Sequence, residues 1–407
     1  MHTLDQLESG ALAGAREVRL CRQGLTHFPP ALFALADTLE LLDLSGNQLT
    51  QLPDDLPRLR KLRVLFASDN PFTQLPPVLG QMPELDMVGF KACRIAEVPA
   101  ASLPPRLRWL ILTDNRIRTL PDALGDRPRL QKLMLSCNQL DQLPDTLARC
   151  NRLELVRIAS NRFTAMPTVL LQLPQLRWPA LGGNPITQKS ERAALAASTA
   201  PAIPYQDLEV GEQLGEGASG TIYRAHYRGT GTGTSLAHGA ALALKVFKAA
   251  HTSDGTPQSE LAAGLSVLRH PQLLTPLASV TGHPERRLAM ALPLLPSGMQ
   301  PLAAPPSLRS CSRDIYPPNL RLTPAAVQHL LAQITAAMRH LHHSGVLHGD
   351  LYAHNILWDP ATGTTMLSDL GAALLMHELP PAHAQALQQV ELRALHTLRD
   401  ELYAIAR

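Results

Sequence analysis

Apolar and polar positions recur with a long, regular period through the first half of the chain. From residue 15 to about residue 185 the sequence repeats the unit LxxLxLxxNxLxxLPxxLxxLPx. One polar position of the unit recurs at steps of 22 or 23 residues, at Asn47, Asn70, Cys93, Asn115, Asn138, Asn161 and Asn184. An atypical first unit with Gln23 precedes them, which gives eight units. Such a period predicts stacked units that bury one continuous core.

The residues of one unit explain its predicted shape. Each LxLxxN segment has the pattern of a short strand, and its leucines point into a core that one unit could not bury alone. The asparagine side chain can bond to backbone groups where the chain turns away from the strand, and Cys93 can fill that place as a small buried residue. This half of the chain therefore resembles a leucine-rich-repeat solenoid, a horseshoe with its strands on the concave side.

The strand positions between and beside these leucines should face outward on the concave side. They are mostly apolar, and they include two tryptophans in a chain with only 4% aromatic residues. Exposed apolar patches tend to mark interaction sites. The pattern predicts a protein partner on this stripe; packing of the chain's own second half onto it is the alternative. The stripe consists of Val64, Phe66, Met87, Trp109, Ile111, Met134, Leu155 and Trp178.

The repeat pattern fades between Ile186 and Pro204. The segment SERAALAAS predicts a short helix that shields the last repeat, and TAPAIP predicts a stiff, proline-containing linker. The predicted boundaries are a repeat domain at 1–185, a capping helix and linker at 186–204, and a second domain at 205–407.

A glycine-rich segment opens the second half. Residues 211–225 read GEQLGEGASGTIYRA, in which Gly215, Gly217 and Gly220 form GxGxxG and Ile222 follows. Alone, this motif also occurs in dinucleotide-binding folds. Here it lies between two strand-like apolar runs, with no helix after the third glycine, which favours a hairpin whose glycine amides lie over phosphates.

Four further segments follow in order. ALALKVF places Lys245 on a predicted strand, SELAAGLSVLRHP predicts a helix that carries Glu260, and LAMALPLLP (288–296) reads as another strand and a hinge. A long amphipathic helix then leads into HGDLYAHN, with Asp350 and, five residues later, Asn355. Fourteen residues after Asn355 stands Asp369 in SDLG.

These segments, in this order and at these separations, resemble the protein kinase family over residues 208–402, most clearly over 340–371. Together with the repeats, the chain resembles a bacterial-type leucine-rich-repeat protein kinase. The resemblance implies an α/β chain, with a horseshoe solenoid of eight repeats followed by a bilobal kinase-like α+β domain. Its N-lobe would cover about 205–292 and its truncated C-lobe about 297–407.

The resemblance also implies ATP and Mg²⁺ as cofactors. The protein must position and neutralise a phosphoryl group that carries dispersed negative charge. Lys245 would hold the α- and β-phosphates, Glu260 would orient Lys245, and Asp350 would accept or orient the proton of the substrate hydroxyl. Asn355 and Asp369 would bind Mg²⁺ as oxygen donors. The other nucleotide-binding residues would be Leu214, Gly215, Glu216, Gly217, Ala218, Ser219, Gly220 and, around adenine, Ile222, Ala243 and Leu357.

The sequence departs from the kinase pattern at several places. Gly349 replaces the arginine that usually binds a phosphate of the activation segment, which argues against control by phosphorylation there. Tyr352 stands where serine/threonine kinases have a lysine, and only His354 could supply its charge. No Ala-Pro-Glu follows Asp369, and Glu391 resembles the acidic residue that braces the catalytic loop. The usual peptide-docking platform is expected to be missing or minimal.

Composition narrows the function classes. A net charge of +3 without a basic run argues against nucleic-acid binding, and no stretch approaches the roughly 18 apolar residues of a membrane span. The N-terminus carries Asp5 and Glu8 and lacks the apolar core of a signal peptide. Five irregularly spaced cysteines favour buried thiols in a reducing compartment. We therefore expect a cytoplasmic protein.

The main interpretation is an ATP- and Mg²⁺-dependent protein kinase that phosphorylates serine or threonine, with repeats that recruit a protein partner. One alternative is a pseudokinase scaffold that binds partners with little or no phosphotransfer, favoured by Tyr352 and the short C-lobe. The other is a small-molecule kinase, because HGD-x4-N also resembles aminoglycoside phosphotransferases, although those lack the glycine-rich loop.

Overall fold

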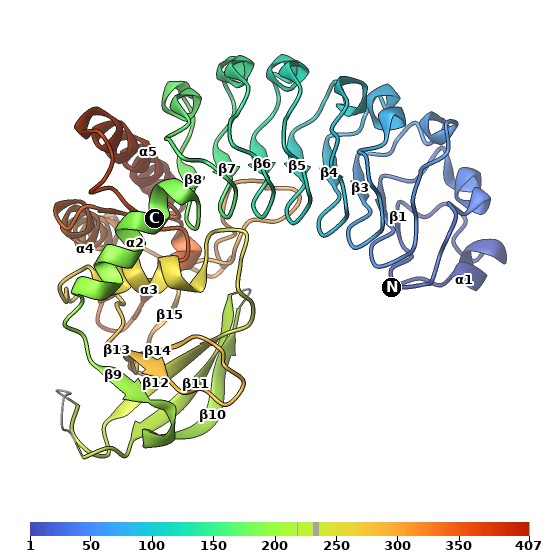
Figure 1. Cartoon of the computed structure of the whole chain (residues 1–407). Helices are drawn as coiled ribbons and strands as arrows, with labels where there is room; N and C mark the ends of the chain where they lie inside the picture. Colours follow the sequence, from blue (N-terminus) through green and yellow to red (C-terminus); the bar gives the residue numbers. More distant parts are fainter. Residues whose placement is uncertain (218, 231–235, 407) are drawn as a thin grey trace. The chain divides into compact units, whose positions relative to one another are not determined.

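The computed structural model describes residues 1–217, 219–230 and 236–406 (Figure 1). The chain forms two compact units, Met1–Leu176 and Arg177–Arg407. Among the described residues, no helix combines the length and the apolar composition that crossing a lipid bilayer requires.

The first unit is a stack of short repeats. After the helix α1 (Leu4–Glu8), strands follow one another in a parallel sheet whose order is the order of the sequence. Each strand leads through an irregular segment into a short 3₁₀ turn that usually follows a proline, as at Pro77–Gln81 after Pro76 and Asp145–Arg149 after Pro144. The strands of this unit are β1 (Glu17–Arg19), β2 (Leu41–Asp43), β3 (Val64–Phe66), β4 (Met87–Gly89), β5 (Trp109–Ile111), β6 (Lys132–Met134) and β7 (Leu155–Arg157).

The recurring asparagine has the role that the repeat pattern predicts. The side-chain amide of Asn138 donates to the carbonyl oxygens of Leu112 and Leu135, both at 2.9 Å, and its oxygen accepts from the Ile117 N–H at 3.0 Å. One side chain therefore joins adjacent repeats. At Cys93 the thiol lies 3.6 Å from the Ala67 carbonyl oxygen and replaces the amide donor. Burial raises the pKa of this thiol to about 11.

The predicted apolar stripe is only partly exposed. Val64, Met87 and Leu155 are buried, so the prediction that they face outward into solvent is wrong. Half-buried positions remain at Phe66, Trp109, Ile111 and Met134. The indole N–H of Trp109 lies 3.3 Å from the sulfur of Met134, and the ammonium group of Lys132 lies 4.3 Å from the centre of the indole ring.

The second unit begins with β8 (Trp178–Ala180), the strand of the last repeat copy, and the helix α2 (Pro185–Ala197). Its main sheet has the order β10-β11-β12-β14-β13-β9 in the described part of the unit. These strands are β9 (Ala202–Pro204), β10 (Leu208–Glu216), β11 (Gly220–Tyr227), β12 (Ala241–Phe247), β13 (Ala278–Thr281) and β14 (Ala289–Pro293). The helix α3 (Pro257–Leu265) follows β12 in the chain.

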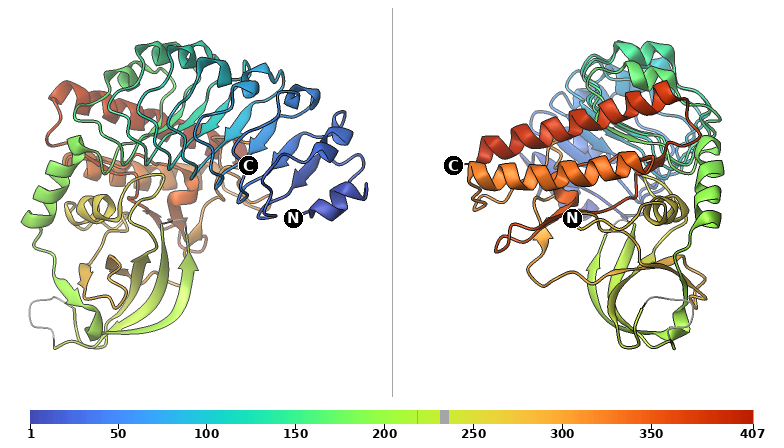
Figure 2. Two further views of the ribbon diagram at one scale, coloured as in Figure 1. Left: turned by 45° about the vertical axis from the view of Figure 1, so that its right-hand side comes forward. Right: turned by 90° about the vertical axis from the view of Figure 1, so that its left-hand side faces the viewer.

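The rest of the second unit is built on two long helices that pack side by side, α4 (Pro324–His343) and α5 (Pro381–Ile405) (Figure 2). The same part of the unit contains two small sheets, β15-β17-β18 and β16-β19. Their strands are β15 (Gln300–Pro301), β16 (Val346–Leu347), β17 (Ile356–Trp358), β18 (Thr365–Leu367) and β19 (Leu374–Leu375).

The segment predicted as a capping helix and linker contributes to the second unit. The helix α2 packs against α3, and the buried Glu191 accepts a hydrogen bond of 2.9 Å from the Ser259 hydroxyl. The end of the expected linker, Ala202–Pro204, pairs in parallel with β13, and Ile203 is buried in the core of the main sheet.

Trp178 is the clearest correction to the predicted partner stripe. It is 1% exposed, and its indole ring stacks on Tyr352 with the ring centres 4.1 Å apart. Its N–H donates to the Leu351 carbonyl oxygen at 3.1 Å. Trp178 is therefore a core residue of the second unit and is unavailable to a partner.

Candidate functional site

One cavity of the second unit collects most of the predicted site residues. Its volume is about 1110 Å³. Ala218 lies outside the described residues, and Asp350 does not line the cavity but contacts a residue that does. The predicted residues in the lining are Leu214, Gly215, Glu216, Gly217, Ser219, Gly220, Ile222, Ala243, Lys245, Glu260, Asn355, Leu357 and Asp369.

The glycine-rich segment forms the hairpin between β10 and β11. The Gly217 N–H donates to the Gly220 carbonyl oxygen at 2.9 Å, and the ammonium group of Lys248 binds the Gly217 carbonyl oxygen at 2.9 Å. A methyl group at Gly220 would lie 2.7 Å from the Val246 carbonyl oxygen, so only glycine allows this approach of β11 to β12.

A buried ion pair joins β12 to α3. The ammonium group of Lys245 lies 2.5 Å from a carboxylate oxygen of Glu260, and the two side chains are 9% and 6% exposed. Burial raises the pKa of Glu260 to about 7; the charge of Lys245 opposes this rise, and the charge of Asp369 adds to it. The structure therefore brings together the lysine and the glutamate that the sequence pairs.

Asp350 and Asn355 are joined directly. The amide nitrogen of Asn355 donates to the backbone oxygen and to a carboxylate oxygen of Asp350, both at 2.9 Å. His348 ties this loop to the segment before Asp369, because its Nε2 donates to the Ser368 carbonyl oxygen at 2.9 Å. The loop therefore holds the carboxylate of Asp350 against Asn355, a residue of the cavity lining.

Asp369 has a left-handed backbone, with a φ of 60°. Its carboxylate accepts a hydrogen bond of 3.0 Å from the Gly371 N–H. Asp369 and Asn355 line the same cavity as Lys245. Their oxygens are of the kind that Mg²⁺ prefers, so these residues suit a metal-bound polyphosphate.

Models of known families match both units. A protein kinase domain model matches residues 208–389, and a leucine rich repeat model matches residues 14–72 and 105–163. The chain carries leucine-rich repeats and a protein kinase domain. The predicted fold class, a repeat solenoid followed by a kinase domain, is confirmed.

Similar proteins divide between the two parts. PH domain leucine-rich repeat-containing protein phosphatase 1 of Homo sapiens is 35% identical over 92 residues, 22% of this chain and 5% of that protein. A serine/threonine-protein kinase/receptor of Acanthamoeba polyphaga mimivirus is 28% identical over 180 residues, 44% of this chain and 10% of that protein. A serine/threonine-protein kinase of Dictyostelium discoideum is 26% identical over 160 residues, 39% of this chain and 15% of that protein. The chain thus spans a small part of each relative.

The structure explains why glycine occupies position 349 of the kinase domain. Its φ is 76°, and a side chain there would overlap the carbonyl oxygen of Ala372. Its N–H donates to a carboxylate oxygen of Glu391 at 2.8 Å, and the other oxygen of Glu391 bonds to Nε2 of His342 at 2.6 Å. Glu391 therefore braces the loop, but from the middle of α5.

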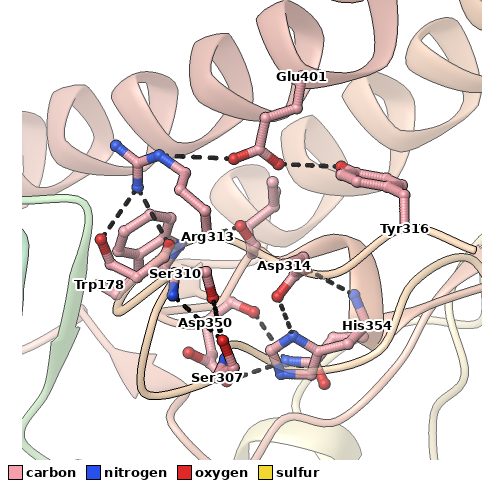
Figure 3. Close-up of polar contacts among 12 residues, drawn as sticks. Trp178, Ser307, Ser310, Arg313, Asp314, Tyr316, Asp350, His354 and Glu401 are labelled. Carbon is pink, nitrogen blue, oxygen red and sulfur yellow. Dashed lines mark hydrogen bonds and ion pairs between the residues drawn. The ribbon is translucent and has the colours of Figure 1, made fainter. Parts of the chain in front are cut away.

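Sequence reasoning missed a second brace of the same loop in the kinase domain. Both carboxylate oxygens of Asp314 contact His354, one accepting from its N–H at 2.9 Å and one bonding Nδ1 at 2.8 Å (Figure 3). Burial lowers the pKa of His354, but the hydrogen bond and charge of Asp314 and the charges of Asp350 and Asp369 raise it overall. Asp314 lies in an irregular proline- and serine-rich segment, where no motif marks it.

Proposed function

We propose that the kinase domain binds ATP with Mg²⁺ and transfers the γ-phosphoryl group to a serine or threonine hydroxyl of a protein. The observation that carries this proposal is the convergence of the glycine hairpin, Lys245, Asn355 and Asp369 on one cavity. The serine/threonine-protein kinases among the similar proteins support the same reaction.

The residues present suit both cofactors. Ile222, Ala243 and Leu357 give the cavity an apolar part suited to adenine, and the ammonium group of Lys245 suits the phosphates. Asn355 and Asp369 would hold Mg²⁺, which would neutralise charge on the phosphates. Glu260 holds the ammonium group of Lys245 in place.

Asp350 would act on the protein substrate. Its carboxylate is fixed by the amide of Asn355, so it can orient the substrate hydroxyl and accept its proton as the oxygen bonds to the γ-phosphorus. The bond from that phosphorus to the β,γ-bridging oxygen breaks, and ADP leaves with the electron pair.

The purified chain, incubated with γ-labelled ATP and Mg²⁺, should label itself or a general protein substrate. Asp350→Asn should abolish labelling while it leaves ATP affinity nearly unchanged, because the carboxylate acts in the transition state. Lys245→Ala should weaken ATP binding about tenfold or more, because a charge-assisted contact contributes roughly 1.5–3 kcal/mol. Labelling by Asp350→Asn at the wild-type rate would exclude this assignment.

A scaffold without phosphotransfer is the second candidate. Tyr352 occupies the position of a lysine in serine/threonine kinases, and its ring stacks on Trp178. This observation favours binding without efficient transfer. ATP binding that requires Lys245, together with no labelling of any acceptor, would support the scaffold.

For the first unit we propose a protein partner at Phe66, Trp109, Ile111 and Met134. These half-buried apolar side chains lie on β3, β5 and β6. The ring of Phe66 lies over Gly89 of β4, the strand between β3 and β5. Replacing Phe66 and Trp109 by alanine should lower partner affinity by about 2 kcal/mol or more if they are hot spots. Equal recovery of partners by wild type and the double variant, both folded by circular dichroism, would exclude this surface.

A further inference from the structure

The helix α2 packs against α3, the helix that carries Glu260 (Figure 1). Leu195 of α2 packs on an apolar cluster that contains Leu261 of α3. Glu191 lies one turn before Leu195, so both side chains are on the face of α2 that meets α3. The two helices are therefore joined by apolar packing and by a polar contact at Glu191.

The polar contact at Glu191 is buried. One carboxylate oxygen of Glu191 accepts from the Ser259 hydroxyl at 2.9 Å and from the Gly183 N–H at 3.2 Å. Glu191 is 7% exposed and Ser259 is 2% exposed. A carboxylate at such a place is costly unless donors reach it, so the loss of either partner should be felt.

This contact lies next to the ion pair of the cavity. Ser259 directly precedes Glu260, and both residues belong to the first turn of α3, a helix of only nine residues. Helix ends fray, and a helix this short depends on packing for its stability. The place of the Glu260 carboxylate, 2.5 Å from the ammonium group of Lys245, therefore depends on how the first turn of α3 is held.

The helix α2 also supports a second element of the site. Both α2 and α3 contact β19, the strand that follows Asp369 in the chain. An exposed ion pair of 2.8 Å between Lys189 and Glu378 adds to this contact, but exposed pairs contribute little. One helix thus touches the elements next to both Glu260 and Asp369.

We propose that Glu191 of α2 is a positioning residue: it holds the first turn of α3 so that Glu260 stays paired with Lys245, and it thereby sets the affinity for ATP. This inference rests on the proposed function, because it assumes that ATP occupies the cavity. The helix α2 lies before residue 208, where the match to the kinase domain begins, so the kinase pattern does not include this contact.

The first measurement is amide hydrogen exchange in α3 without nucleotide. Ser259→Ala removes the donor and Glu191→Ala removes the acceptor. Each should speed the exchange of the α3 amides about tenfold, because a hydrogen bond to a charged group is among the stronger ones. Glu191→Gln keeps an acceptor oxygen and should retain most of the protection.

The second measurement is ATP affinity, by calorimetry with Mg²⁺. Affinity falls with the fraction of molecules that keep Glu260 paired, so Ser259→Ala and Glu191→Ala should each weaken ATP binding by about threefold to tenfold. Glu191→Gln should stay within about twofold of the wild type. Ser259→Ala is the smaller change, and it decides the test if Glu191→Ala does not fold.

Two controls separate a positioning role from a merely structural one. Ser190 is also buried in α2, but its hydroxyl donates within the helix, to the Thr187 carbonyl oxygen at 2.8 Å. Ser190→Ala should change neither α3 exchange nor ATP affinity. In a Glu260→Ala background, adding Glu191→Ala should not weaken ATP further, because Glu191 acts through Glu260.

The outcomes separate this inference from the proposed function. A wild type that binds no ATP overturns the proposed function, and α3 exchange then decides whether Glu191 holds that helix. A wild type that binds ATP overturns only the role of Glu191 if Ser259→Ala and Glu191→Ala leave either measurement unchanged. An equal loss of affinity in Ser190→Ala, or a further loss in the Glu260→Ala background, would overturn it as well.

Discussion

The buried pair of Lys245 and Glu260 should give the kinase domain two opposite responses to pH. The pKa of Glu260 is raised from 4.5 to about 7, mainly by burial. The folded protein therefore holds a proton that the unfolded chain releases between pH 4.5 and about pH 7. Its free energy of unfolding should fall as the pH rises through this window and level off above it. Lys245 and Glu260 are both charged only above this pH window. ATP affinity should therefore rise as the pH rises through it.

The structure gives the size of both effects. A pKa change from 4.5 to about 7 corresponds to a loss of stability on the order of 3 kcal/mol at most. The gain in ATP affinity is limited by the contact between Lys245 and phosphate, roughly 1.5–3 kcal/mol, or about tenfold and more.

Glu260→Gln tests both responses at once. Glutamine keeps an acceptor for the ammonium group of Lys245, but it does not titrate. Hydrogen exchange at the amides of β12 and α3 would report stability from pH 5 to 8, and calorimetry with ATP and Mg²⁺ would report affinity. The nucleotide's own titration is common to both proteins, so the difference between them isolates Glu260. Equal pH slopes in wild type and variant, in both measurements, would refute the reasoning.

Two further substitutions test the framework of each unit. Asn138→Ala removes three hydrogen bonds, two of them to the preceding repeat, and should lower the stability of the first unit by about 2–4 kcal/mol, measured by urea unfolding. A loss below about 0.5 kcal/mol would contradict the role of the asparagine. Gly349→Arg restores the residue of the kinase pattern but forces a side chain into a left-handed backbone against Ala372. It should lower the thermal midpoint of the kinase domain by several degrees, and an unchanged midpoint would contradict the argument.

The features predicted correctly from the sequence are those that depend on local spacing. The repeat asparagines act on carbonyl groups of their own and the preceding unit, so a fixed period reveals both position and role. The pairing of Lys245 with Glu260 follows from the order of a strand and a helix close in the chain. In both cases the contact joins residue types at a recognisable place in the sequence pattern, so the pattern identifies both partners.

The features that were missed depend on contacts across long stretches of chain. Trp178 has the spacing of an outward repeat position, but its neighbour is Tyr352, far along the chain, and no period reports that contact. Asp314 binds His354 from an irregular segment without motif or periodicity. The strand β9 pairs with β13 through only three residues that follow a proline. Contacts with residues far away in the sequence determine the roles of these residues.

The departure from the kinase pattern at Tyr352 is compensated by its surroundings, so restoring the usual residue should do harm. Tyr352 is 5% exposed and lies between Trp178 and His354, with ring centres 4.1 and 4.9 Å away. Tyr352→Lys would bury an ammonium group there, at a cost of several kcal/mol, and would lose a stacking contact of about 0.5–1.5 kcal/mol. We expect a lower thermal midpoint and no gain in ATP affinity, whereas Tyr352→Phe keeps the stack and should match the wild type closely. A Tyr352→Lys variant that is as stable as the wild type and binds ATP more tightly would contradict this argument. It would show that the surroundings of Tyr352 do not compensate for the missing lysine.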